Sequence, residues 1–142
     1  MIDRIAIDAM GGDFGPSEIV PAAAHVLKRH DDLVIILVGR KDRLEEELAR
    51  NGLEASERLQ IRHAEETVEM HELPSTALRN KKRSSMRIAI ELVRDKEAHA
   101  CVSAGNTGAL MAISRYVLKM LPGIDRPAIC SVMPGLKGHT HF

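Results

Sequence analysis

The chain reads LVIILV at residues 33–38, and this stretch decides the fold class. A strand that rests on a core through one face alternates apolar and polar residues, whereas these residues are apolar at every position. Such a strand is buried on both faces, as in a parallel sheet covered by helices. Gly39 follows directly and ends the strand. The stretch therefore predicts an inner strand of an α/β sheet.

Helical and strand-like segments alternate on both sides of this stretch. The predicted strands are residues 5–10, 33–38, 58–64, 98–103 and 126–134. The predicted helices are one from about Ser17 or Pro21 to residue 30, residues 43–50 and 75–82, one that begins at Ser84 or Ser85, and residues 109–121. Strands that alternate with helices imply right-handed parallel crossovers. We therefore expect a three-layer α/β/α sandwich with a mainly parallel sheet.

Single residues set the boundaries of two helices. Pro21 has no backbone N–H and is tolerated in a first helical turn, so the first helix is predicted to start near it. Asp42 is the predicted N-cap of the second helix, because its carboxylate can accept a hydrogen bond from a free backbone N–H. Gly52 is the predicted stop of that helix.

The length of 142 residues suggests one domain. Residues 138–142 end the chain just after a predicted strand, where doubly wound folds normally add a covering helix. We therefore expect residues 1–142 to form a single α/β domain that is truncated.

The composition excludes several classes of protein. Apolar residues make up 44% of the chain and charged residues 28%, as in soluble globular proteins. The formal net charge is zero, which gives no support for nucleic-acid binding. The N-terminus has no signal-peptide core, and the longest apolar run is too short to span a bilayer. We expect a cytoplasmic protein, for which a peripheral contact with the membrane stays open.

Two cysteines, Cys101 and Cys130, lie in apolar runs, and neither has metal-ligand spacing to other residues. We expect both to be buried free thiols in a reducing compartment. The histidines form no HExxH pattern. The cysteines and histidines thus give no support for a metal site.

The loop at residues 103–108 (SAGNTG) joins a predicted strand to a predicted helix. Gly105 and Gly108 allow a close approach of the backbone to a ligand, and Ser103, Asn106 and Thr107 add short polar side chains. The free N–H groups and the dipole at a helix N-terminus stabilise an anion. An ordinary tight turn with a capping residue explains the same pattern. The loop lacks the Gly-Lys-Ser/Thr ending of a Walker loop.

A second loop follows the first strand and contains Asp8, Gly11, Gly12 and Asp13. Two carboxylates beside a Gly-Gly turn can bind a metal, accept a hydrogen bond from a ligand or cap nearby backbone. The turn lacks the GxGxxG spacing of dinucleotide-binding folds. Ligands of open α/β sheets bind at the carboxyl ends of strands, so both loops are candidate site segments.

A third segment, residues 74–86, carries four cations within five positions. Arg79 and Lys82 are three residues apart and can point to one side of a helix. A solvated helix face explains such a run. Together with a helix N-terminus at Ser84 and Ser85, the two cations can also hold a phosphate, or they can meet an acidic protein partner.

Four stretches together resemble the phosphate acyltransferase family of bacterial phospholipid synthesis. They read DAMGGDFGP at residues 8–16, PSTALR at 74–79 followed by SSMR at 84–87, VSAGNTGAL at 102–110, and LPGIDRP at 121–127. Several long motifs in one order are more specific than a lone glycine pattern.

The resemblance extends to about residue 134 and implies a fold and a reaction. The fold is an α/β/α sandwich related to phosphate acetyltransferases and isocitrate dehydrogenases. The reaction transfers a fatty acyl group from acyl carrier protein to inorganic phosphate, and the acyl phosphate serves phospholipid synthesis. The family resemblance also implies a homodimer, cytoplasmic or loosely membrane-associated, without a metal or organic cofactor. Members of the family are longer than this chain, so residues of their second half are absent here.

These expectations give a hypothesis for the site. Phosphate is expected at the 103–108 loop, where backbone N–H groups and Asn106 or Thr107 donate hydrogen bonds. Asp8 and the turn at residues 11–12 are expected to shape the pocket floor, and Arg79 and Lys82 to bind phosphate or the carrier. Two alternatives stay open: a phosphate acetyl- or butyryltransferase that uses coenzyme A thioesters, and a non-catalytic fragment that binds phosphate or carrier.

Overall fold

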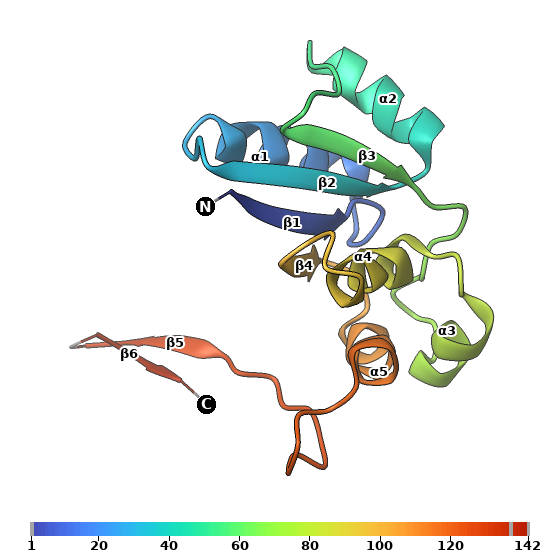
Figure 1. Ribbon diagram of the computed structural model, residues 1–142, viewed down its shortest axis with the longest axis vertical. Coiled ribbons are helices and arrows are strands. Elements are labelled where there is room, and N and C mark those ends of the chain that lie inside the picture. Colours follow the sequence, from blue (N-terminus) through green and yellow to red (C-terminus); the bar gives the residue numbers. More distant parts are fainter. Residues whose placement is uncertain (1, 137, 142) are drawn as a thin grey trace.

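The computed structural model describes residues 2–136 and 138–141 and contains a four-stranded parallel sheet (Figure 1). Its strands are β1 (Asp3–Asp8), β2 (Leu33–Gly39), β3 (Leu59–His63) and β4 (Ala100–Ser103). They lie side by side in the order β3-β2-β1-β4. The expected α/β fold with a mainly parallel sheet is confirmed.

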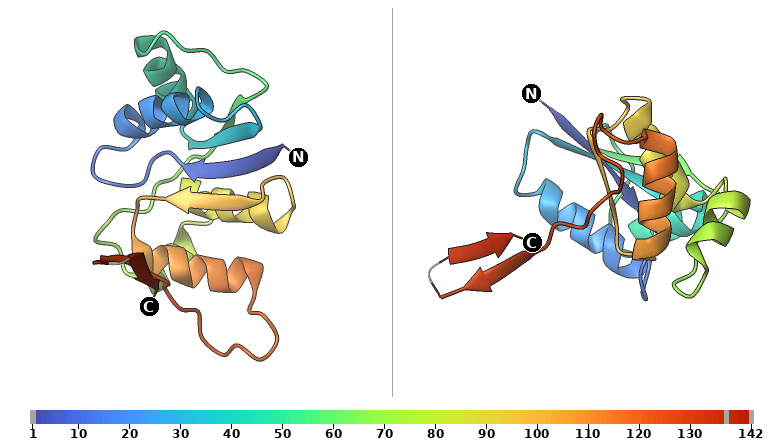
Figure 2. Two further views of the ribbon diagram at one scale, coloured as in Figure 1. Left: turned by 90° about the vertical axis from the view of Figure 1, so that its left-hand side faces the viewer. Right: turned by 90° about the horizontal axis from the view of Figure 1, so that it is seen from below.

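Helices cover both faces of the sheet (Figures 1 and 2). They are α1 (Pro16–Leu27), α2 (Lys41–Arg50), α3 (Pro74–Asn80), α4 (Ser85–Arg94) and α5 (Thr107–Leu118). The helices α1 and α2 pack on one face, whereas α4 packs on the other. The helices α3 and α5 lie outside α4 and share a third apolar cluster with it. Sheet and helices therefore form the three expected layers.

The strand β2 is buried along its whole length, as the LVIILV stretch predicts. Ile35 and Leu37 pack against α1 and α2, whereas Ile36 and Val38 face the cluster that contains α4 residues. Burial of each such side chain contributes about 1.5–3 kcal/mol. One inner strand thus supplies apolar side chains to both cores.

Two predicted helix boundaries are wrong. The helix α1 begins at Pro16, so Pro21 lies inside it. Its missing N–H costs one hydrogen bond to the carbonyl of Ser17, an exposed residue that water can reach. The N-cap of α2 is Arg40, and Asp42 lies in the first turn. There it forms an ion pair with Arg40 at 2.7 Å, and the hydrogen bond from Arg40 lowers the pKa of Asp42.

The predicted last strand at residues 126–134 does not join the sheet. Instead β5 (Val132–Gly135) pairs in antiparallel fashion with β6 (Gly138–His141), and this hairpin projects from the body (Figure 2). Gly138 has a φ of 140°, which residues with a side chain rarely adopt. Pairing with the next residues along the chain replaces the expected pairing with the distant sheet. As a result β4 stays at the edge of the sheet, and its Val102 is exposed.

The two thiols lie in different environments. Both cysteines are free; Cys101 is half-buried in β4, whereas Cys130 is exposed before β5. The prediction of a buried thiol is wrong for Cys130, because its segment does not enter the sheet. Burial, and then the nearby charge of Asp8, raise the pKa of the Cys101 thiol.

The helices of the described residues are too short or too polar to cross a membrane. Within residues 2–136 and 138–141, none of the helices combines the length and hydrophobicity that a membrane span requires.

Candidate functional site

The strands β1 and β4 pair in parallel, so the loops that follow them meet at one edge of the sheet. Asp8, the last residue of β1, lies opposite Ser103, the last residue of β4. The Ser103 hydroxyl donates a hydrogen bond to Asp8 Oδ2 at 2.7 Å, and its oxygen accepts one from the Gly105 N–H at 3.1 Å. Asp8 is only 2% exposed and also accepts from the Met10 N–H. The two loops are therefore joined by a continuous chain of hydrogen bonds.

Gly11 makes this close approach feasible. A Cβ atom at this position would lie 2.7 Å from Asp8 Oδ2 and 2.9 Å from the Gly105 nitrogen. Gly12 has a φ of 86° and faces Ala104. Both glycines thus occupy positions that a larger residue would disturb. Of the residues proposed from sequence, the structure brings together Asp8, Gly11, Gly12, Ser103 and Gly105.

Asn106 was expected to contact phosphate, but in the structure it caps α5 and binds the backbone of residues 69–72. It is the N-cap of α5, and its Oδ1 accepts a hydrogen bond from the Ala109 N–H at 3.0 Å. Its amide nitrogen donates to the carbonyls of Glu69, Met70 and Glu72 at 3.3, 3.0 and 2.9 Å. Both ends of the amide are engaged, so Asn106 has no free donor for a ligand. The sequence indicated the cap but not the link to residues 69–72.

The exposed part of the site is the first turn of α5. Thr107 and Gly108 are its first two residues, and their N–H groups have no acceptor within the helix. Thr107 is exposed. A Cβ atom on Gly108 would lie 2.8 Å from Pro74 Cγ, so glycine lets α3 approach this turn. The Thr107 side chain and two N–H groups are therefore available to an anion.

The two serines before α4 are not open to a ligand. Ser84 is buried, donates to the Lys81 carbonyl at 2.8 Å and accepts from the Arg87 N–H as the N-cap of α4. Ser85 is 1% exposed, and its hydroxyl has no hydrogen-bond partner among the described residues. The expected phosphate contact through Ser84 and Ser85 does not fit this burial.

Arg79 and Lys82 lie together but apart from the 103–108 loop. Both are exposed and line one groove with Tyr116 of α5. Tyr116 lies nine residues beyond Thr107 in α5. A rise of about 1.5 Å per residue separates the two by about 14 Å along the helix axis.

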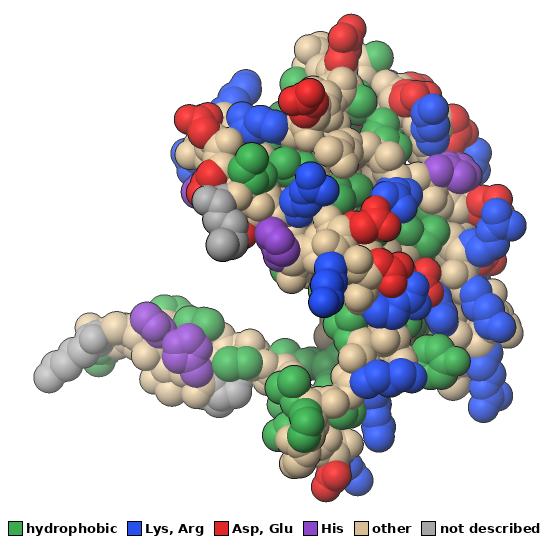
Figure 3. Space-filling view, in the orientation of Figure 1, with side chains coloured by type: hydrophobic (Ala, Val, Ile, Leu, Met, Phe, Trp, Pro, Cys, Tyr) green, Lys and Arg blue, Asp and Glu red, His purple; other side chains and the backbone are tan. Residues whose placement is uncertain are grey.

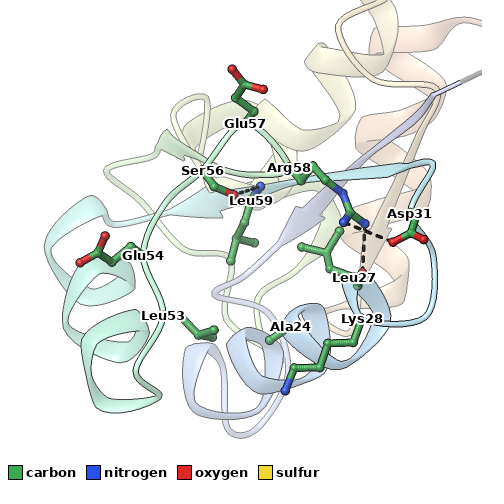
Figure 4. Close-up of a pocket in the computed structure, with 10 residues that line it drawn as sticks. All are labelled: Ala24, Leu27, Lys28, Asp31, Leu53, Glu54, Ser56, Glu57, Arg58 and Leu59. Atoms are coloured by element: carbon green, nitrogen blue, oxygen red, sulfur yellow. Dashed lines mark hydrogen bonds and ion pairs between the residues drawn. The ribbon is translucent and has the colours of Figure 1, made fainter.

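Another cavity lies at the opposite edge of the sheet. It has a volume of about 650 Å³ and is formed by the end of α1 and the start of β3 (Figure 4). Arg58 borders it, donates to the carbonyls of Leu27 and Leu33 at 3.0 and 3.2 Å, and pairs with Asp31 at 3.8 Å. These bonds tie Arg58 to the backbone between α1 and β2. Nothing in the sequence pattern marked Arg58 for this role.

Metal ligands do not converge in the described part of the chain. Within residues 2–136 and 138–141, no three His, Cys, Asp or Glu side chains lie close enough to hold a metal ion. Asp13 is exposed, whereas the buried Asp8 accepts bonds from Ser103 and Met10.

Comparison with known proteins identifies the family to which this chain belongs. A family model described as "Fatty acid synthesis protein" matches residues 3–141. The chain belongs to the fatty acid synthesis protein family. The motifs of the two joined loops thus lie within a match that covers nearly the whole chain.

Curated proteins with similar sequences are named phosphate acyltransferases. The protein of Hydrogenovibrio crunogenus is 59% identical over 138 residues, which cover 97% of this chain and 41% of that protein. The protein of Methylococcus capsulatus is 58% identical over 96% of this chain and 40% of its own length. The resemblance inferred from the motifs is confirmed. The chain spans about two fifths of the length of the curated relatives it matches.

Solved structures show the same fold at low sequence identity. A phosphotransacetylase from Streptococcus pyogenes superposes with a TM-score of 0.68 at 19% identity, over 96% of this chain and 44% of that one. The EutD phosphotransacetylase from Staphylococcus aureus has a TM-score of 0.60 at 18% identity, over 95% of this chain and 44% of its own. The expected likeness to the phosphate acetyltransferase fold is confirmed.

Proposed function

We propose that this chain carries part of the site of an enzyme that transfers a fatty acyl group from acyl carrier protein to inorganic phosphate. The product is an acyl phosphate for membrane phospholipid synthesis. The observation that carries the proposal is the joined pair of loops at the carboxyl ends of β1 and β4, beside the exposed first turn of α5. The relatives are named phosphate acyltransferases, which supports the transfer of an acyl group to phosphate.

The proposed phosphate site is the first turn of α5. The N–H groups of Thr107 and Gly108 and the Thr107 hydroxyl donate to the phosphate, and the helix dipole stabilises its charge. The Ser103 hydroxyl donates a hydrogen bond to Asp8 and accepts one from the Gly105 N–H. Ser103 therefore serves as a positioning residue that fixes the turn. This arrangement refines the hypothesis from sequence, in which Asn106 was a donor.

The chemistry needs orientation more than a strong base. A phosphate oxygen attacks the thioester carbonyl carbon, the carbon–sulfur bond breaks, and the carrier thiolate leaves. Phosphate is anionic at pH 7 and already nucleophilic. Alignment of the two reactants, and donors for the oxyanion that develops on the carbonyl oxygen, supply the rate enhancement. As the family resemblance implies, we propose a homodimer that acts in the cytoplasm or at the membrane surface without a metal or organic cofactor.

The test is phosphate-dependent formation of acyl phosphate from long-chain acyl–acyl carrier protein, with this chain and a full-length relative in parallel. The substitution Thr107→Val is made in the protein that is active, this chain or the relative. It removes a donor worth about 1 kcal/mol and should raise the KM for phosphate about 5-fold. The KM for the acyl carrier should not change. Thr140→Val, an exposed threonine in β6, is the matched control.

Other outcomes contradict parts of the proposal. An unchanged KM for phosphate in Thr107→Val would contradict the assignment of the phosphate site to the first turn of α5. Preference for acetyl-coenzyme A over the long-chain carrier substrate would favour the acetyltransferase alternative. Activity in the relative alone would identify this chain as a fragment that lacks essential residues.

A further inference from the structure

A second surface feature lies on the far side of α4 from the sheet. It is an open groove of about 520 Å³ between α3 and α5, lined by Leu78, Arg79, Lys82, Arg87 and Tyr116. We call it the α3–α5 groove. The mechanism proposed above uses none of its residues.

Among the described residues, two of the three cations that line this groove have no acid of the chain paired with them. Within the described ranges, Arg79, Lys82 and Lys119 have no carboxylate within 4.0 Å. The helix α2 shows the opposite pattern, since its exposed Lys41 and Arg50 pair with glutamates one turn away. In Figure 3, Lys and Arg side chains gather over the same part of the molecule. The groove thus presents positive charge that an anionic partner can neutralise.

Tyr116 gives the groove an apolar and aromatic contact surface. The residue is 55% exposed and has two cations near its ring, with Arg87 Cζ at 5.4 Å and Lys119 Nζ at 4.9 Å from the ring centroid. Arg87 is held in place by Glu91 at 3.0 Å. Tyr and Arg are the residues that protein–protein interfaces favour. An exposed tyrosine beside two cations is suited to protein contact.

We propose that the α3–α5 groove docks an acidic helix of a protein partner. The identity of that partner rests on the proposed function, which makes it acyl carrier protein, an acidic protein. The groove, rather than the turn at Thr107, then supplies the contact with the carrier body.

The geometry favours a protein over a bound phosphate ion. A phosphate site needs donors that converge on one point. Here the cations come from separate segments: Arg79 is in α3, Lys82 follows it, and Arg87 is in α4. They share the groove with the Tyr116 ring and Leu78. The nearest helix N-terminus offers no open donors, because Ser84 and Ser85 are buried. An acidic helix meets spread positive charge and an apolar floor together.

The test measures binding without turnover. The probe is a bacterial holo-acyl carrier protein that carries no acyl group, titrated into this chain at low and high salt. The double variant Arg79→Glu/Lys82→Glu should raise the Kd at least ~10-fold and flatten its salt dependence. The matched control Lys28→Glu/Arg29→Glu changes the same charge at two exposed cations after α1 and should stay within about 2-fold.

Further measurements separate the explanations. Thermal unfolding should be unchanged in both variants, and Arg79→Gln/Lys82→Gln, which only neutralises the charge, should give an intermediate Kd. Equal carrier binding by wild type and groove variant, or no binding by wild type, would overturn the docking surface. So would a groove variant that loses affinity for inorganic phosphate and keeps the carrier. Groove-dependent carrier binding, with no acyl phosphate formed by either this chain or the full-length relative, would refute the reaction alone.

Discussion

Replacement of Asn106 by alanine is expected to lower the free energy of unfolding by about 3 kcal/mol. The residue joins two segments of the chain: it caps α5 through Ala109, and it holds the backbone at residues 69–72 through its amide nitrogen. The two contributions are separable, because different atoms of one side chain supply them.

The magnitude follows from the contacts. Loss of the cap costs about 1 kcal/mol. The amide has two hydrogens for three carbonyls, so the bonds at 2.9 and 3.0 Å to Glu72 and Met70 dominate. Glu69 and Met70 are exposed, and water replaces the lost donors there. Each of the two bonds therefore contributes about 1 kcal/mol.

The assay is urea unfolding of wild type and three variants. Asn106→Ser keeps a capping oxygen and should lose about 2 kcal/mol, which is less than Asn106→Ala loses. Asn106→Asp keeps the cap but turns a carboxylate oxygen toward three carbonyls, so it should be less stable than Asn106→Ser. Hydrogen exchange at residues 69–73 should accelerate in all three. If Asn106→Ala and Asn106→Ser both unfold within about 0.5 kcal/mol of wild type, the link to residues 69–72 carries no energy and the reasoning fails.

Two further predictions concern the packing of the joined loops and the thiols. Gly11→Ala places a Cβ within 2.9 Å of backbone and should destabilise the protein by about 1–3 kcal/mol in urea unfolding. Gly135→Ala, whose Cβ meets an ordinary 3.6 Å contact, is its control, and equal stability of the two variants would contradict the close approach. The raised pKa of Cys101 favours the neutral thiol, so iodoacetamide should alkylate Cys101 more slowly than the exposed Cys130 near pH 8. The stability that the neutral Cys101 contributes should be complete below pH 9.0 and lost as the pH rises through the raised pKa; equal alkylation rates would show that the thiol is not shielded.

Features that depend on a few neighbouring residues were predictable from sequence. The LVIILV stretch identified β2, since burial on both faces leaves no polar side. Ser84 was one of two predicted caps of α4, and it fills that role through the Arg87 N–H. The loops after β1 and β4 were recognised because glycines and short polar residues follow apolar strands. The strand order was not predicted, so the position of Asp8 opposite Ser103 comes from the structure.

Features that depend on contacts between distant parts of the chain were not predictable from sequence. Asn106 contacts carbonyls 34 to 37 positions away, and no local pattern distinguishes such a contact from a ligand donor. Pro21 was expected to start a helix, but an exposed carbonyl one turn earlier makes an interior position tolerable. Residues 126–134 were predicted to form the last strand of the sheet, yet only Val132–Gly135 form a strand, and it pairs with β6.

The hydrogen bond between Asp8 and Ser103 spans 95 positions of the chain and has a consequence for synthesis on the ribosome. The strand β1 emerges first and can pair with β2 as soon as that segment appears, but its other edge faces β4 and stays bare. The joined loops cannot form until more than a hundred residues have been translated. Until then the nascent chain exposes an unpaired strand edge that another chain can occupy. A pause in translation before β4 therefore prolongs the interval in which this protein is prone to aggregate.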